Sequence, residues 1–180
     1  MTGKLLEKAH DSLTKATDNQ GWTPLHFAAL IGNTPIVIQL LDCDKSVAYL
    51  RDKNDKKTAL HIAASKGHKR VMKELISRCP DCCELVDRKG RNILHYVVEN
   101  KRFGLEYIIQ EHPWLSNILL NGKDNDGNTP LHLLAVSLSI PSHLLLDDRV
   151  DFMALNNKKQ NTSDIILADD TFSMMMPGQV

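Results

Sequence analysis

Four histidines recur along the chain, each at the end of a short phrase. The phrases are Thr23-Pro24-Leu25-His26, Thr58-Ala59-Leu60-His61, Asn92-Ile93-Leu94-His95 and Thr129-Pro130-Leu131-His132. Imidazole rings bind metals and transfer protons, so these positions invite a metal-binding or catalytic interpretation. The histidines lie 35, 34 and 37 residues apart, and none has the His-Glu-x-x-His spacing of a helix-borne zinc site. Such spacing distributes the rings along the fold, so we expect structural histidines, with no metal and no catalytic residue.

The cysteines offer a second possible chemistry. Cys79 and Cys82 form a Cys-x-x-Cys pair, and Cys43 and Cys83 complete the set. Zinc would need a second pair of ligands at a suitable spacing, and a thioredoxin-like site would need a strand–helix–strand context. Neither accompanies the pair, so we expect free loop thiols in a reducing, cytoplasmic setting. A methionine-rich metal site at 174–176 is the sharper alternative to plain apolar tail residues.

Each phrase has the features of a helix start. Thr is a favoured N-cap because its hydroxyl accepts a hydrogen bond from an amide one turn on, and Pro suits the first helical position. Gly32 and Gly67 stand where the helices of the first two copies should end. Apolar residues then recur at helical spacing over 36–41 and 71–76, which predicts a second helix in each unit.

A turn cluster precedes each phrase. Asp, Asn and Gly supply the turn chemistry of a tight finger in three of these clusters, at 18–21, 87–90 and 124–127. The cluster at 52–57 is one residue longer and lacks glycine, so we expect a finger of altered geometry there. Lys101 and Leu138 replace the helix-ending glycine in the third and fourth units, so those two corners are weakly defined.

A helix–turn–helix unit with this period and this opening phrase is similar to the ankyrin repeat. The expected fold is therefore all-α, an ankyrin-repeat solenoid of stacked helix–turn–helix units with β-turn fingers. A degenerate fifth phrase is expected to begin at Thr162. We expect a partial repeat at each end, as in a piece of a longer protein. The predicted boundaries are 1–17 (second helix of a missing repeat), 18–51, 52–86, 87–123, 124–156, 157–170 (degenerate partial repeat) and 171–180 (tail).

Composition places the chain among ordinary globular proteins. Its 180 residues are 42% hydrophobic and 24% charged, without an apolar run long enough to span a membrane and without a secretory signal. The net charge is zero, but residues 51–102 carry fourteen Lys and Arg against seven Asp and Glu, and residues 103–180 carry four against ten. This asymmetry favours a protein partner of complementary charge. Nucleic acid is not expected, because no base-reading motif accompanies the basic stretch.

A partner should contact the finger tips and the ends of the first helices, which line one concave edge of such a stack. Trp22 is the best single anchor, since aromatic residues carry a large share of binding energy, although it could equally cover the neighbouring finger. The predicted partner-binding residues are Asn19, Gln20, Trp22, Leu30, Ile31, Asn54, Lys56, Lys57, Ser65, Lys66, Arg88, Lys89, Arg91, Glu99, Asn100, Asn125, Asp126 and Asn128, with Val136 and Ser137 beside them.

Several segments resemble one group of ankyrin proteins more closely. DNQGWTPLHFAA, CCELVDRKGRNILHYVV and VDFMALNNKKQNTSDII look like plant ankyrin proteins of the accelerated-cell-death and salt-tolerance type. In that family the array is followed by a Pro-Gly-Gly motif and several transmembrane helices, and members act at membranes in defence and stress signalling. Here the sequence ends Pro177-Gly178-Gln179-Val180, with Gln in place of the second glycine.

Three functional hypotheses follow. The first is a non-catalytic protein-interaction module, which the resemblance would assign to plant defence or stress signalling. The second is the soluble ankyrin portion of a multi-pass membrane signalling protein, which would be at a membrane only through a transmembrane domain beyond this chain. The third, an enzyme that uses the Cys79 and Cys82 thiols, is the least favoured, and no cofactor is expected.

Overall fold

A computed structural model describes residues 13–100, 118–137, 140, 142–145 and 147–168. The chain divides into two compact units, Met1–Phe103 and Gly104–Val180, which are described separately here. Several predictions lie outside the described residues: the start of the partial repeat at 1–17, the second helix of the third repeat, the corners at Lys101 and Leu138, and the tail with its methionines.

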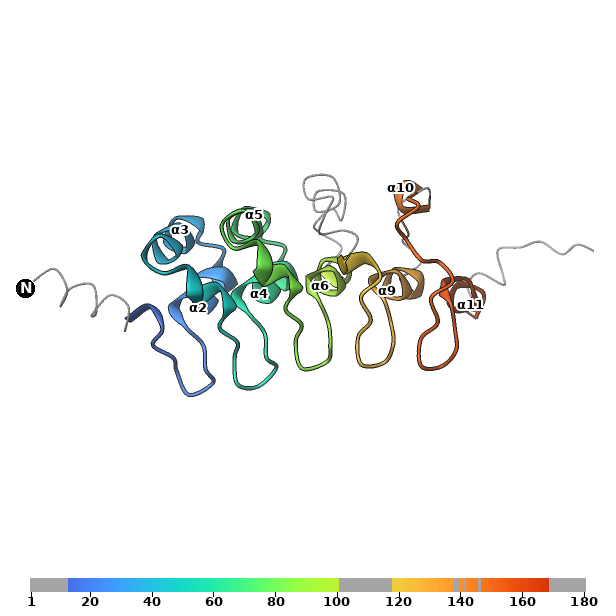
Figure 1. The fold of residues 1–180 in the computed structure, drawn as a ribbon, viewed down its shortest axis with the longest axis horizontal. Coiled ribbons are helices and arrows are strands. Elements are labelled where there is room, and N and C mark those ends of the chain that lie inside the picture. The colour runs from blue at the N-terminus through green and yellow to red at the C-terminus, as the bar shows by residue number, and fades with distance from the viewer. Residues whose placement is uncertain (1–12, 101–117, 138–139, 141, 146, 169–180) are drawn as a thin grey trace, which may run out of the picture. The chain divides into compact units, whose positions relative to one another are not determined.

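The described part of the first unit contains two helix pairs and then a further helix. In chain order these elements are α2 (Pro24–Ile31), α3 (Thr34–Cys43), η1 (Lys45–Tyr49), α4 (Ala59–Lys66), α5 (Lys69–Arg78), η2 (Pro80–Glu84) and α6 (Ile93–Asn100). Figure 1 shows α2, α4 and α6 side by side in one layer, α3 and α5 in a second layer, and the fingers on the opposite side. Contacts join α2 to α4, α4 to α6 and α3 to α5, so each helix pair packs on the next.

The helix boundaries follow from the expected capping chemistry. Thr23 and Thr58 are the N-cap residues of α2 and α4, and in each case the histidine side chain reaches back to the N-cap amide. Gly32 and Gly67 end these helices in the left-handed conformation, with φ of 81° and 71°. Both glycine positions predicted from the sequence are thus confirmed, because only glycine adopts this conformation without a steric cost.

The core is built from residues of the repeated phrases. Leu25, Leu60 and Leu94 are completely buried, and so are the small residues Ala29 and Ala63. Alanine permits close approach of a neighbouring backbone, whereas leucine fills more of the core volume. This division of roles recurs from unit to unit, so the repeats stack with similar geometry.

The second unit contains the fourth and fifth copies of the phrase. Its described helices are α9 (Pro130–Val136), α10 (Ser142–Leu145) and α11 (Thr162–Leu167), and α9 contacts α11. Asn161 is the N-cap of α11 and shares a capping box with Asp164, so these two residues replace Thr and His. The fifth phrase therefore starts at Asn161, one residue before the start expected from the repeat period.

The described residues contain helices, turns and irregular structure but no β-strand, which confirms the all-α fold class. Within that part of the chain, no helix combines the length and the apolar character that crossing a bilayer requires. The repeat boundaries stay predictions, because helices and fingers mark the repeats without fixing the residue at which one ends.

Candidate binding surface

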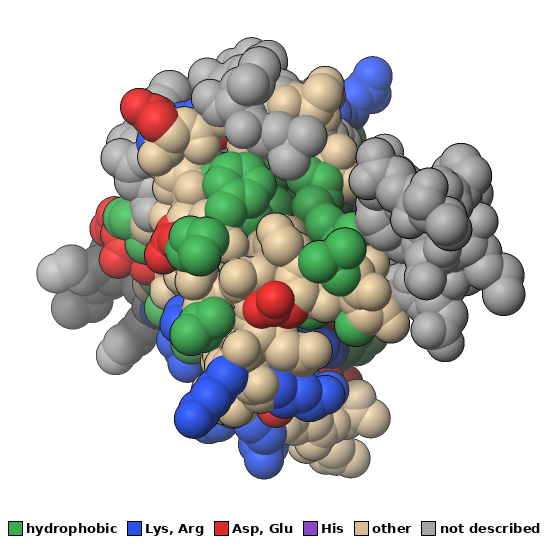
Figure 2. Space-filling model, turned by 90° about the vertical axis from the view of Figure 1, so that its right-hand side faces the viewer, with side chains coloured by type: hydrophobic (Ala, Val, Ile, Leu, Met, Phe, Trp, Pro, Cys, Tyr) green, Lys and Arg blue, Asp and Glu red, His purple; other side chains and the backbone are tan. Residues whose placement is uncertain are grey.

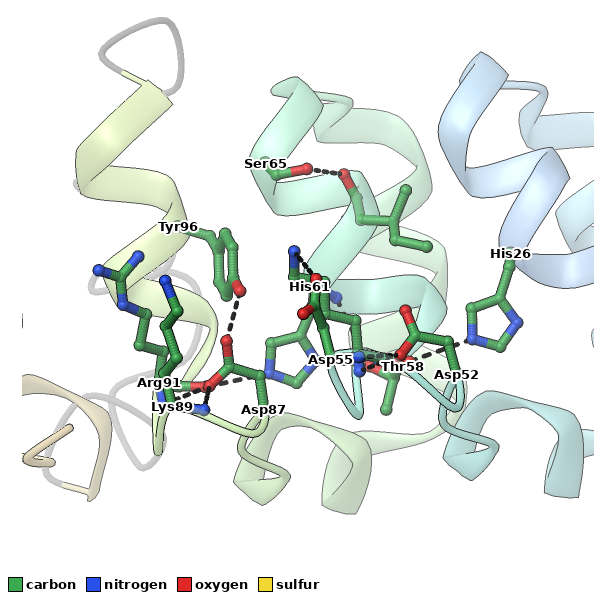
Figure 3. Close-up of polar contacts among 12 residues, drawn as sticks. His26, Asp52, Asp55, Thr58, His61, Ser65, Asp87, Lys89, Arg91 and Tyr96 are labelled. Carbon is green, nitrogen blue, oxygen red and sulfur yellow. Dashed lines mark hydrogen bonds and ion pairs between the residues drawn. The ribbon is translucent and has the colours of Figure 1, made fainter. Parts of the chain in front are cut away.

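Histidines of the phrases connect neighbouring repeats through hydrogen bonds. His26 Nδ1 accepts from the Thr23 amide at 3.1 Å, and its Nε2 donates to the Lys57 carbonyl at 3.2 Å. His61 does the same with the Thr58 amide (3.2 Å) and the Arg91 carbonyl (3.3 Å). Each ring therefore caps its own helix and holds the next finger along the chain (Figure 3).

These contacts fix the protonation state of the rings. A backbone amide can only donate and a carbonyl can only accept, so Nδ1 must be bare and Nε2 must carry the proton. Burial disfavours the charged imidazolium, which lowers the pKa of His26 and lowers that of His61 to about 4. His132 makes the same two contacts, with the Thr129 amide at 3.1 Å and the Gln160 carbonyl at 3.1 Å. Rings that each make two backbone hydrogen bonds agree with the predicted structural role.

Each finger is organised by one acidic or amide side chain at its base. Asp87 Oδ1 accepts from the amides of Lys89 and Arg91, both at 2.8 Å, and Asp87 N donates to the Arg91 carbonyl at 3.0 Å. Asp18, Asp52, Asp124 and Asn156 make the corresponding side-chain contacts in the other four fingers. The side-chain oxygen thus replaces a backbone acceptor inside a tight turn.

The glycine-free finger at 52–57 forms with the altered geometry that its sequence predicts. Lys56 takes the position of the turn glycine at a φ of 60°, and the closing bond spans one more residue, from Asp52 N to the Lys57 carbonyl at 2.9 Å. Lys159 likewise takes the position of the turn glycine in the fifth finger, at a φ of 59°. A non-glycine residue carries a steric cost in this left-handed region, so these two turns are strained relative to the others.

Adjacent fingers are joined through their backbones. Lys53 N donates to the Gln20 carbonyl at 2.9 Å in the first unit, and Asn157 N donates to the Asp126 carbonyl at 3.0 Å in the second. The fourth and fifth fingers approach each other so closely that a Cβ added at Gly127 would lie 2.7 Å from Asn157 N. The tips are therefore held at a fixed spacing within each unit.

In the first repeat, the predicted surface residues surround an aromatic pair. Asn19, Gln20 and Ile31 are exposed, with Ile31 at 73%, whereas Trp22 and Leu30 are half-buried. The Trp22 ring lies 5.2 Å from that of Phe27, and Phe27 remains 43% exposed. The Trp22 ring thus packs on His26 and Phe27 of its own repeat, and its role as an anchor for a partner stays a prediction.

In the second repeat, Asn54, Lys56 and Lys66 are exposed at the surface. Lys57 is half-buried, with its Nζ 2.8 Å from Asp55 and 5.5 Å from the centre of the Tyr96 ring. Ser65 donates to the Ile62 carbonyl at 2.8 Å. Lys57 and Ser65 are therefore engaged within the fold.

In the third repeat, Arg88 and Lys89 are exposed at the finger tip. Arg91 pairs with Glu99 at 2.8 Å, so these two predicted contact residues bind each other. The Asn100 amide donates to the Ser65 carbonyl of the preceding repeat and also lies 3.5 Å from the Ala64 carbonyl. Asn100 thus satisfies helix-end carbonyls that would otherwise lack a partner.

In the second unit, the fourth and fifth repeats form a groove of about 510 Å³. Three predicted residues lie in its wall, Asp126, Asn128 and Val136, whereas Asn125 is exposed beside it and uses its carbonyl to accept from Asn157 at 2.9 Å. Ser137 is half-buried and donates to the Leu134 carbonyl at 2.9 Å. The other lining residues are His132, Leu133, Asn156, Asn157, Lys158, Gln160, Ile165 and Ala168.

Apolar side chains also lie at the surface outside this groove. Figure 2, which faces the α11 side, shows hydrophobic side chains gathered across that face and cations along its lower edge. Met153, Leu155 and Leu167 are among the exposed apolar residues of this segment. The second unit therefore has exposed apolar side chains in addition to those that line the groove.

Sequence reasoning missed one recurrent apolar position, the residue directly after the histidine of each phrase or, in the fifth copy, after Asp164. This position is occupied by Phe27, Ile62, Tyr96, Leu133 and Ile165. Ile62 and Tyr96 are buried, whereas Phe27 is exposed and Leu133 and Ile165 line the groove of the second unit. Their shared offset from the histidine was a usable signal, because residues at equivalent positions of stacked helices share one face.

The cysteines do not form a reactive site. No disulfide joins them, and three of the four, Cys79, Cys82 and Cys83, are buried, so the expected free thiols are mostly within the core. Burial raises the pKa of Cys79, and the contact with Cys83 together with burial raises that of Cys82. Thiolate formation is thus disfavoured. Within the described ranges, no three His, Cys, Asp or Glu side chains converge in a way that could hold a metal ion.

The stacked helix pairs, capping boxes and regularly joined fingers define a helical repeat protein. A family model described as ankyrin repeats in three copies matches residues 3–84 and 32–113. The chain belongs to the ankyrin repeat family, whose members use a non-catalytic fold for protein–protein interactions.

Curated relatives are diverse. The chain is 30% identical over 159 residues to regulatory protein SWI4 of Saccharomyces cerevisiae, covering 78% of this chain and 14% of that protein. It is 35% identical over 120 residues to a transient receptor potential cation channel (subfamily A member 1) of Drosophila melanogaster, covering 64% and 10%. A probable 26S proteasome regulatory subunit p28 of S. cerevisiae is 28% identical over 170 residues, covering 93% and 73%. The chain thus spans a small part of the first two relatives and most of p28.

Proposed function

We propose that the chain is a non-catalytic interaction module that binds a partner protein through its finger tips and the exposed faces of its first helices. One observation carries the proposal. The residue before each N-cap closes its finger through its backbone carbonyl in all five copies, yet its side chain changes from copy to copy. The five residues are Trp22, Lys57, Arg91, Asn128 and Gln160.

This separation of duties is what a recognition scaffold requires. The Lys57, Arg91 and Gln160 carbonyls each accept from the preceding histidine as well. The backbone at this position therefore makes the hydrogen bonds that hold the finger in place. The side chains are thereby released to vary in charge, size and polarity, and adjacent variable side chains on rigid supports form a specific surface.

The proposed surface contains the residues predicted from the sequence, but we expect them to differ in how much each contributes to binding. Exposed tip residues and the Trp22–Phe27 pair are the expected direct contacts, together with Asp126, Asn128 and Val136 in the groove. Arg91, Glu99 and Asn100 are expected to contribute by shaping the surface, since Arg91 and Glu99 pair with each other and the Asn100 amide donates within the fold. We retain the predicted repeat boundaries as the units of this proposal.

A role in plant defence or stress signalling is the finer proposal, which rests on the sequence resemblance alone. The alternative is that the chain is the soluble ankyrin portion of a multi-pass membrane signalling protein, and a cation channel among the relatives favours it. Sequencing the complete transcript separates the two. Several apolar spans encoded after Val180 would favour the membrane protein, and a stop codon there would favour an independent module.

The interaction surface is tested by matched substitutions. Phe27 in the first-helix layer and Ile36 in the second-helix layer are both 43% exposed. A partner recovered with the wild-type chain is titrated calorimetrically against Phe27→Ala, Trp22→Ala and Ile36→Ala. We expect about tenfold weaker binding for the first two and wild-type binding for the third, because exposed aromatic residues dominate interface energies. Unchanged binding by both aromatic variants would place the interface elsewhere.

A further inference from the structure

Exposed charge on the fingers of repeats two and three is predominantly basic, although their sequences also contain acids. Asp52 and Asp87 are only 4% and 6% exposed, because their carboxylates accept backbone amides inside the turns. The Tyr96 hydroxyl also donates to Asp87 at 2.6 Å. Asp52 and Asp87 therefore point inward, whereas Asp55 of the second finger is exposed. Their exposed cations, named here the basic tips, are Lys53, Lys56, Arg88 and Lys89.

The neighbouring carboxylates are also engaged. Asp55 pairs with Lys57 at 2.8 Å, and Glu99 pairs with Arg91 at 2.8 Å. Asp18 accepts the amides of its own finger at 2.9 and 2.8 Å. These carboxylates are therefore matched by groups close to them, so the basic tips keep a net positive field.

The basic tips are held in register with one another. The Lys53 side chain lies 3.5 Å from the Asn19 carbonyl, and the Arg88 guanidinium donates to the Lys53 carbonyl at 2.8 Å. Arg88 N also donates to the Asp55 carbonyl at 2.6 Å. Each tip thus reaches back to the finger before it, which gives the positive surface a defined shape.

Apolar surface lies beside this positive surface in the same unit. Finger one is bonded to finger two through the Lys53 amide, and at the base of finger one the Trp22 and Phe27 rings lie 5.2 Å apart. Ile31 projects from the end of the same helix and is 73% exposed. The first unit therefore has both exposed cations and an exposed apolar patch, and a ligand that is only a polyanion would leave the patch unused.

We propose that the first unit binds an acidic protein segment, which places Asp or Glu residues against the basic tips and an apolar side chain against the Trp22–Phe27 patch. This rests on the proposed interaction function and specifies its partner chemistry. Charge complementarity carries the acidic part, and the exposed aromatic pair favours a polypeptide over a nucleic acid or an anionic membrane.

The test uses the intact chain as bait for a random 16-residue peptide library displayed on phage. We expect selected peptides to be enriched in Asp and Glu around an aromatic or aliphatic residue. The best peptide is then synthesised and titrated against Lys56→Glu/Lys89→Glu, with Lys69→Glu/Lys73→Glu as control. Lys69 and Lys73 are exposed on α5 in the second-helix layer, outside the proposed surface, so the change in net charge is matched. We expect about tenfold weaker binding for the double variant and no change for the control. The difference between the double variant and the wild type should increase at low salt, because salt screens the charges less.

The outcomes separate this proposal from the broader one. If the peptide loses affinity with Phe27→Ala but not with the double charge reversal, the acidic-segment proposal is wrong and the interaction surface stands. If neither substitution matters, or if the library yields no binder, both proposals fail. If the chain instead prefers a 20-base-pair DNA duplex or phosphatidylserine vesicles, and this preference is lost in the double variant, the basic tips serve a polyanion and the protein-segment proposal is overturned.

Discussion

His61 connects two repeats through a single buried ring. It accepts from the Thr58 amide, donates to the Arg91 carbonyl and lies edge-on to the Tyr96 ring at 5.6 Å. We expect His61→Ala to lower the free energy of unfolding by about 3 kcal/mol, because it leaves two buried backbone groups unpaired and creates a cavity. Urea denaturation measures this, with the exposed Lys66→Ala in the same helix as control. If His61→Ala lowers the free energy of unfolding no more than the control does, the ring does not stabilise the contact between the two repeats.

The same rings make stability dependent on pH. The folded protein holds His61 with a pKa of about 4 and holds the pKa of His26 below its ordinary value of 6.5, so the unfolded chain binds more protons below pH 6.5. Full stability is therefore present above pH 6.5 and is lost progressively as the pH falls towards 4, by about 3 kcal/mol for His61 alone. Urea titrations at pH 7, 6 and 5 give the slope. His61 should show no imidazole titration near pH 6.5 by NMR.

At the scale of elements, the fingers depend on one left-handed residue each. Gly127 has a φ of 77°, and a Cβ there would lie 2.7 Å from the Asn157 amide nitrogen of the next finger. We expect Gly127→Ala to destabilise the chain by about 2 kcal/mol, through backbone strain and the loss of the bond between fingers. The reverse change, Lys159→Gly, should be neutral or stabilising at a φ of 59°. Thermal unfolding of both variants checks the two signs, and equal shifts would disprove the strain argument.

The Cys-x-x-Cys pair is buried at the short helix η2. Cys82 and Cys83 lie within it and Cys79 immediately precedes it, all three buried, whereas Cys43 is exposed at the end of α3. We expect a thiol reagent at pH 8 to label Cys43 rapidly and the other three only as the chain unfolds, because their thiolates are disfavoured and shielded. Rapid labelling of Cys79 or Cys82 in the folded protein would reopen the redox hypothesis. Cys43→Ser controls for the fast phase.

Elements were predictable where local chemistry decides them. The phrases Thr23-Pro24-Leu25-His26 and Thr58-Ala59-Leu60-His61, with the glycines after them, identified α2, α4 and their ends, because capping and left-handed φ depend on a few neighbouring residues. The fifth phrase was recognised only as a degenerate copy, since Asn161 and Asp164 provide the same capping box with different side chains. Equivalent hydrogen-bonding geometry therefore survives changes that erase the sequence pattern.

Contacts between repeats were less predictable. Asn100 was expected at the surface, but it binds carbonyls of the preceding repeat, and Arg91 and Glu99 bind each other. Sequence period places these residues on the exposed edge without showing how far each side chain reaches across the stack. Whether a polar group meets solvent or a neighbouring helix end depends on that offset.

At the scale of the molecule, we expect each repeat to have its own local stability, so that the chain does not unfold as one cooperative block. The described first helices contact their neighbours in sequence order within each unit, α2 with α4, α4 with α6, and α9 with α11. In a protein of this type, stability is a sum of repeat and nearest-neighbour terms. A local defect should therefore loosen its own repeat and the adjoining ones first.

Hydrogen exchange of His61→Ala tests this distribution, and Gly127→Ala provides the reciprocal control. We expect His61→Ala to accelerate exchange in α4 and α6, whose repeats the ring joins, and to leave amides of α11 at wild-type protection. Gly127→Ala should accelerate exchange in the fifth finger and α11 and spare α4, because its defect lies between the fourth and fifth fingers. If both variants instead accelerate every protected amide by one common factor, the chain unfolds as a single cooperative block, and nearest-neighbour coupling does not describe it.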